Sequence, residues 1–60
     1  MKTVFISYAV ISPAVLATII EAHFTTAVCN WREVDEDYFE FRVYGVADLP
    51  MLEDVLAAWV

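Results

Sequence analysis

The sequence has very little of the side-chain chemistry on which enzymes and small cross-linked proteins depend. Its 60 residues include one cysteine, one histidine and one glycine. A single cysteine cannot form an internal disulfide, which excludes a disulfide-rich secreted fold. Cys29 and His23 supply only two of the about four ligands that a structural zinc needs. One glycine cannot build a phosphate-binding loop, and we expect neither a metal nor a cofactor.

Positive charge is also scarce, since three basic residues stand against nine acidic ones and the net charge is −6. Lys2, Arg32 and Arg42 are too few to neutralise a row of phosphates, which argues against direct binding of nucleic acid. An acidic surface is attracted instead to basic surfaces, including those of proteins that bind nucleic acid. The alternative is that the charge only keeps a small apolar protein soluble.

No arrangement typical of catalysis is present. The one histidine, one cysteine and two serines have no nearby partners that would form a nucleophilic site. Neighbouring carboxylates occur only at residues 35–37 and 53–54, where we expect solvent exposure rather than the apolar pocket that raises the pKa of a catalytic acid. Residues 35–37 also lack the ligand–glycine–ligand pattern of a calcium loop. We predict that the protein is not an enzyme.

Apolar residues make up 62% of the chain, which is long enough for one domain over residues 1–60. So short a chain needs a dense core or a partner that covers its apolar surface. The uncharged run from Val4 to Ile20 raises the alternative of a small membrane protein. It has seventeen residues, fewer than the ~20 of a spanning helix. Ser12 and Pro13 interrupt it, so we expect a cytoplasmic protein.

Three segments have the composition of β-strands. Residues 2–10 are rich in β-branched and aromatic side chains with few polar ones, which predicts a strand covered on both faces, as at the centre of a sheet. Residues 25–34 and 38–46 are expected to pair as an antiparallel hairpin. The second of these alternates between two faces, one with Phe39, Phe41 and Val43 and the other with Tyr38, Glu40, Arg42 and Tyr44.

Two helices are predicted from their first residues and their apolar stripes. Ser12 and Pro13 suit the start of a helix that ends near His23. Asp48 suits the cap of a second helix that runs to the C-terminus. The apolar stripes recur at helical spacing and consist of Leu16, Ile19, Ile20 and Phe24 in the first helix and Leu52, Val55, Leu56 and Trp59 in the second.

The predicted order is β-α-β-β-α, an α+β fold with a three-stranded antiparallel sheet and both helices on one face. This topology resembles a ferredoxin-like fold without its last strand. The other sheet face is then open, with Tyr38, Arg42 and Tyr44 as possible contacts. Phe5 and either Val28 or Trp31 are expected to join them. A homodimer that buries this face is one alternative function.

The hairpin carries five carboxylates within eight residues. A rigid hairpin with such charge can present an array similar to that of DNA phosphates to a basic groove. The second helix extends this surface if its first turn faces the hairpin. The predicted partner-binding residues are Glu33, Asp35, Glu36, Asp37 and Glu40 in the hairpin and Asp48, Glu53 and Asp54 in the helix.

In size, charge and topology the whole chain resembles the small phage-encoded inhibitors of host defence, such as anti-CRISPR proteins, several of which are mimics of DNA. The resemblance implies a stoichiometric inhibitor that acts in the host cytoplasm. It also implies a partner, which would be a CRISPR effector subunit or another host protein that handles nucleic acid.

Overall fold

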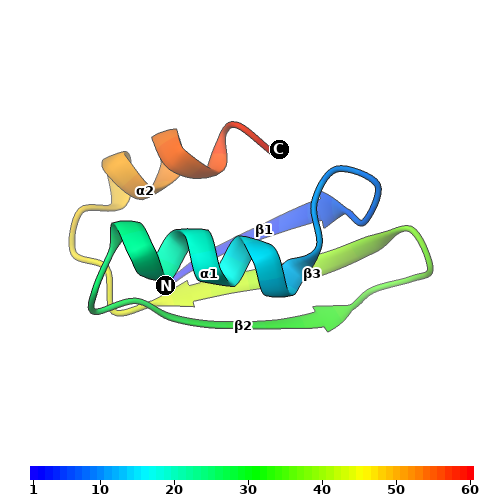
Figure 1. Ribbon diagram of the computed structural model, residues 1–60, viewed down its shortest axis with the longest axis horizontal. Coiled ribbons are helices and arrows are strands. Elements are labelled where there is room, and N and C mark those ends of the chain that lie inside the picture. The colour runs from blue at the N-terminus through cyan, green and yellow to red at the C-terminus, as the bar shows by residue number, and fades with distance from the viewer.

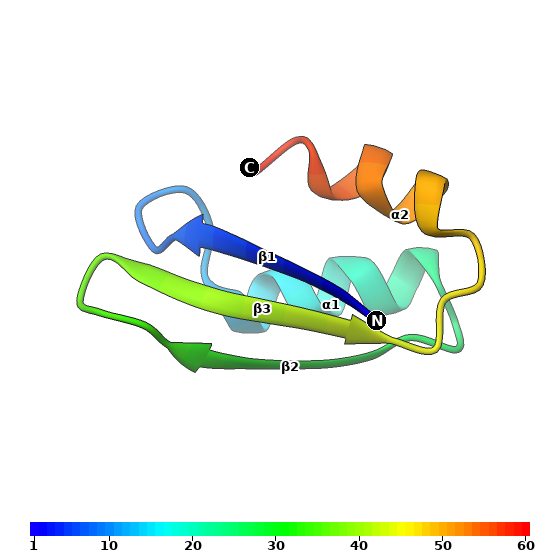
Figure 2. The same cartoon turned by 180° about the vertical axis from the view of Figure 1, so that it is seen from behind.

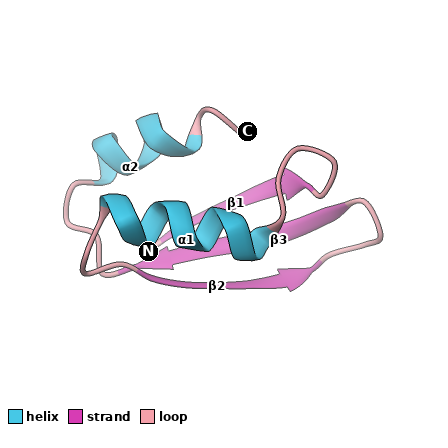
Figure 3. Cartoon of the chain, in the orientation of Figure 1, coloured by secondary structure: helices cyan, strands magenta, loops and turns pink.

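The computed structural model describes residues 1–60. Its elements follow the predicted order, β-α-β-β-α, as Figure 1 shows. Their bounds are β1 Lys2–Ser7, α1 Pro13–His23, β2 Val28–Glu33, β3 Tyr38–Tyr44 and α2 Leu49–Leu56. The strands form one antiparallel sheet in the order β1-β3-β2. Both helices cover the same face of this sheet (Figures 2 and 3), so the predicted α+β fold is confirmed.

The core lies between the helices and the inward face of the central strand. Phe39, Phe41 and Val43 in β3 are almost completely buried, as their alternation predicts. Both helical stripes also contribute to this core. Their buried members are Leu16 and Ile20 in α1 and Leu52 and Leu56 in α2, and Ala17 beside the first stripe is also buried.

Each helix begins at the predicted capping residue. The Ser12 hydroxyl accepts a hydrogen bond from the Val15 N–H at 3.3 Å, and Pro13 occupies the first helical turn. The Asp48 carboxylate accepts one from the Met51 N–H at 3.1 Å. These bonds satisfy N–H groups that have no partner within the helix.

The place of the first strand in the sheet differs from the prediction. β3 is central, and β1 lies at an edge, paired only with β3. Val4 and Ile6 of β1 face the helices, whereas Phe5 lies on the open face and is 58% exposed. The scarcity of polar residues in residues 2–10 suggested a central strand, but this segment forms an edge strand with one exposed phenyl ring.

The strands are also shorter than predicted, because tight turns close at their ends. The Ser7 carbonyl accepts a hydrogen bond from the Val10 N–H at 3.1 Å, which ends β1 at Ser7. The Phe24 carbonyl accepts one from the Ala27 N–H at 2.9 Å, so β2 begins at Val28. The apolar run from residue 4 to residue 20 is divided between β1 and α1, and neither helix is long and apolar enough to cross a membrane.

Candidate functional site

The end of β2 and the loop that joins it to β3 carry a group of exposed carboxylates that we call the acidic tip, made of Glu33, Asp35, Glu36 and Asp37. The Asp35 carboxylate accepts hydrogen bonds from the Asp37 N–H at 2.8 Å and from the Tyr38 N–H at 3.0 Å. The Val34 N–H donates to the Tyr38 carbonyl at 3.1 Å. Asp35 therefore folds the loop on itself, as aspartate does in many turns.

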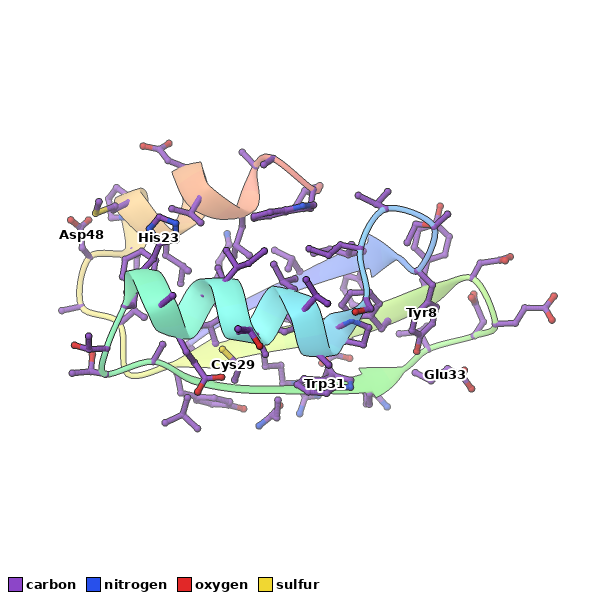
Figure 4. The ribbon with its side chains drawn as sticks, viewed as in Figure 1. Tyr8, His23, Cys29, Trp31, Glu33 and Asp48 are labelled. Carbon is purple, nitrogen blue, oxygen red and sulfur yellow. The ribbon has the colours of Figure 1, made fainter.

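A second loop supports the acidic tip. The Tyr8 N–H donates to the Asp37 carbonyl at 3.0 Å, and the Tyr8 ring packs on Phe39 with ring centroids 5.0 Å apart. Figure 4 shows Tyr8 and Glu33 at the same end of the molecule. Burial raises the pKa of the Tyr8 phenol, and the charges of Glu33 and Asp35 raise it further. No pattern in the sequence indicates this contact, because it depends on how the strands align.

No basic side chain forms an ion pair with the acidic tip. Lys2 pairs with Glu53 at 3.0 Å. The two arginines pair with Glu40, on the open face of the sheet. All three basic side chains are therefore engaged elsewhere, and the carboxylates of the tip are without a cationic partner.

Glu40 lies at the centre of this open face. Arg32 is directly opposite it on β2, and Arg42 follows two residues later on β3, so all three side chains share one face. Arg32 holds one carboxylate oxygen at 2.9 Å, and Arg42 holds the other. The Glu40 side chain is only 7% exposed. These hydrogen bonds, from Arg32 first and then Arg42, hold the pKa of the Glu40 carboxyl below its usual value.

The inclusion of Glu40 in the acidic partner surface does not fit this geometry. Its charge is balanced by two guanidinium groups and is shielded from solvent. The sequence places Glu40 close to the tip, but the alternation of strand side chains turns it towards the open face. Its contribution is to the sheet, where it joins β2 to β3.

The carboxylates of α2 also lie apart from the acidic tip. Lys2 is aligned with Val43, at the far end of β3 from the hairpin loop, and Glu53 binds Lys2 there. The seven residues of β3 span ~20 Å. In Figure 4, Asp48 and Glu33 are at opposite ends of the long axis. Asp48, Glu53 and Asp54 therefore do not continue the surface of the tip.

Apolar and aromatic side chains surround the central ion pairs on the open face. Tyr38 and Tyr44 lie there as predicted, and Phe5 and Val28 join them from the two edge strands. Val28 is 62% and Tyr38 48% exposed. Trp31 lies on the opposite face, where its ring stacks on Phe41 with centroids 6.2 Å apart.

Cys29 and His23, the two residues considered as metal ligands or nucleophiles, lie in surroundings that do not activate them. Burial raises the pKa of the Cys29 thiol, and Glu21 raises it further, which disfavours the reactive thiolate. His23 is exposed at the end of α1. No three side chains of the types that bind metals are placed to hold an ion together.

Comparison of the chain with protein-family models, with curated protein sequences and with solved structures gave no match.

The ion pairs of Glu40 predict how stability depends on pH. A carboxyl whose pKa is lower in the folded than in the unfolded protein stabilises the fold above the unfolded value, near 4.5, and this contribution is lost as pH falls through the folded value. In a Glu40→Gln variant we expect lower stability at neutral pH and a smaller loss on acidification. Urea midpoints at neutral pH and at about pH 3 measure both effects.

Glu36→Gln is the matched control, because it removes a carboxylate from the exposed tip. It should lose stability on acidification as the wild type does. Equal losses in the wild type and in Glu40→Gln would show that the Glu40 ion pairs make no contribution to the fold.

Proposed function

We propose that this protein is a non-enzymatic binding protein whose acidic tip occupies a basic surface of another protein. The strongest support for the proposal is the pairing of charges in the structure. The carboxylates of the tip have no cationic partner, whereas every lysine and arginine of the chain is paired elsewhere. A fixed loop of uncompensated charge favours fast, salt-sensitive association with a surface of opposite sign.

The partner that fits this chemistry is a protein that binds nucleic acid. Its basic groove is built for closely spaced phosphates, and carboxylates on a folded hairpin are a compact substitute. The resemblance in size, charge and topology to phage-encoded inhibitors of host defence supports a CRISPR effector subunit, or another host defence protein in the cytoplasm, as the target. Because the acids of α2 lie at the opposite end, the tip alone forms the proposed contact.

The variant Asp35→Asn, Glu36→Gln, Asp37→Asn is expected to bind the partner on the order of 100-fold more weakly, because three charges are lost from the contact. The asparagine introduced at position 35 retains a side-chain oxygen that can close the loop. The partner is first captured from a host lysate on the immobilised protein and identified. Its affinity for wild type and variant is then titrated at several salt concentrations, with duplex DNA as a competitor.

The matched control is Asp48→Asn, Glu53→Gln, Asp54→Asn, which removes the same charge from the opposite end. The asparagine introduced at position 48 can still cap α2. This control should bind as the wild type does. Equal affinities of the tip variant and the wild type would reject the proposal, as would binding that does not weaken with salt.

A second candidate function is a homodimeric module that buries the open sheet face. The exposed side chains of Phe5, Val28 and Tyr38 on this face favour it. Aromatic side chains and arginine are enriched in protein interfaces. The Val28 variant described in the next subsection separates this dimer from another mode of association.

A further inference from the structure

The outer edge of β1 presents backbone groups that have no partner. Hydrogen-bonding direction alternates along an antiparallel strand. The Tyr8 N–H points to β3, since it donates to the Asp37 carbonyl. Residues two and four positions earlier therefore also point to β3. It follows that the N–H and C=O groups of Thr3 and Phe5 point away from the sheet, and no hydrogen bond within the chain engages them.

Between Lys2 at its start and the turn at Ser7, this edge lacks the features that usually protect an edge strand. Such strands carry charged side chains, proline or a bulge, or are covered by another segment. No charged residue and no proline occurs between Thr3 and Ser7. The register with β3 is continuous from Lys2 to Ser7, without a bulge. Phe5 is largely exposed beside the free edge.

An apolar hollow adjoins the same edge on the helix side. It has a volume of about 210 Å³ and lies between the first half of β1 and the chain from the second half of α2 to the C-terminus. Its apolar lining consists of Val4, Leu56, Ala57 and Val60. The paired charges of Lys2 and Glu53 lie beside it. A strand added to β1 would thus find free backbone groups next to an apolar surface.

We propose that β1 pairs in antiparallel orientation with β1 of a second copy, around a two-fold axis at Phe5, and joins the two sheets into one. In this register Phe5 pairs with Phe5 of the second copy and Thr3 pairs with its Ser7, whose carbonyl already accepts from the Val10 N–H and would accept from Thr3 with its second lone pair. All of these residues have outward-pointing N–H groups. The two phenyl rings then face each other on the open side of the sheet.

Charge permits a second copy at this edge, and the antiparallel register is self-complementary. Residues 3–7 are uncharged, so two chains with a net charge of −6 can meet there without close repulsion. The antiparallel arrangement places Lys2 opposite Tyr8 of the second copy. Tyr8 adjoins the acidic tip through its bond to Asp37, so the Lys2–Glu53 ion pair of each copy, rather than a further carboxylate of the tip, comes nearest to the acidic end of the other.

This dimer goes beyond the proposed function and does not depend on it. The acidic tips lie at opposite ends of the paired strands and remain free, which would make the dimer bivalent towards a partner. The tip variant should therefore dimerise as the wild type does. A variant that no longer dimerises therefore tests only the dimer, and a variant that no longer binds the partner tests only the contact of the acidic tip.

Sedimentation velocity from micromolar to millimolar concentration tests the proposal. We expect the wild type to dimerise and Phe5→Lys to raise the dimer dissociation constant on the order of 100-fold, because two buried rings are replaced by facing ammonium groups. Val28→Lys is the matched control. It adds the same charge at a similarly exposed position on the opposite edge strand, and it should dimerise as the wild type does.

Three results would overturn the proposal: a wild type that is monomeric throughout, a Phe5→Lys variant that dimerises normally, or equal disruption by Val28→Lys, which would indicate the open sheet face. Should Phe5→Lys fail to fold by circular dichroism, Thr3→Pro decides the question. Proline removes only an outward N–H and suits an edge strand, so this variant should be folded and monomeric. Amide exchange at Phe5 should also be slow in the dimer and accelerate on dilution.

Discussion

Replacing Phe41 by alanine is expected to remove about half or more of the free energy of unfolding. Phe41 is fully buried in the central strand, aligned with Val4 on one side and Trp31 on the other. Its ring stacks on Trp31 and meets the edge of Phe39 with centroids 6.3 Å apart. Removal of such a ring costs about 3–5 kcal/mol. A domain of this length has roughly 3–9 kcal/mol of stability in total.

Urea unfolding followed by far-ultraviolet circular dichroism measures this loss. Tyr38→Ala is the control, because Tyr38 lies on the same strand with its ring about half exposed on the other face. We expect it to cost about 1 kcal/mol. If the two variants were equally stable, the division of β3 into a buried and an open face would be wrong.

That division of faces was predictable because it depends only on neighbouring residues. The side chains of β3 alternate strictly, and the period of two assigns Phe39, Phe41 and Val43 to one face without knowledge of any other segment. The helices are equally local, since capping residues and apolar stripes identify Ser12 and Asp48 as their first positions. The order of elements then leaves few ways to cover one apolar sheet face.

The order of strands was not predictable from β1 itself. A strand buried on both faces and an edge strand can have the same composition. Only the exposure of Phe5 in the structure shows which of the two β1 is. The distinction depends on which strand pairs with which, and that is decided by contacts far apart in the sequence. The same apolar composition leaves the edge of β1 without charged side chains between Thr3 and Ser7, which is the basis of the proposed self-pairing.

The acidic tip was recognisable from charge density, but its limits were not. Glu40 is close to the tip in sequence, but the strand alternation turns its side chain away from the tip, and Asp48 lies at the opposite end of the molecule. Both outcomes depend on three-dimensional placement. The structure thus separates a sheet centre, where one carboxylate is paired with two guanidinium groups, from acidic ends, and it reduces the predicted contact surface to the few residues of the tip.

Replacing Gly45 by alanine is the second change that should strongly destabilise the fold. Gly45 has a φ of +80°, a conformation that costs an L-residue with a side chain about 1–2 kcal/mol. A Cβ atom there would also press on the Thr26 carbonyl oxygen, which is backbone and cannot rotate away. The Thr26 hydroxyl donates to the Gly45 carbonyl at 2.6 Å and holds the two segments together. We expect a total loss of about 3 kcal/mol.

Gly45→Asn separates the two causes, and urea midpoints measure all the variants. Asparagine tolerates positive φ better than alanine does, but its Cβ meets the same oxygen. If the contact dominates, the two variants will be equally unstable, and if φ dominates, asparagine will be clearly milder. Thr26→Val removes only the hydroxyl bond and should cost about 1 kcal/mol. A stable Gly45→Ala protein would mean that the chain after β3 does not lie against Thr26, and the path from the hairpin to α2 would then be wrong.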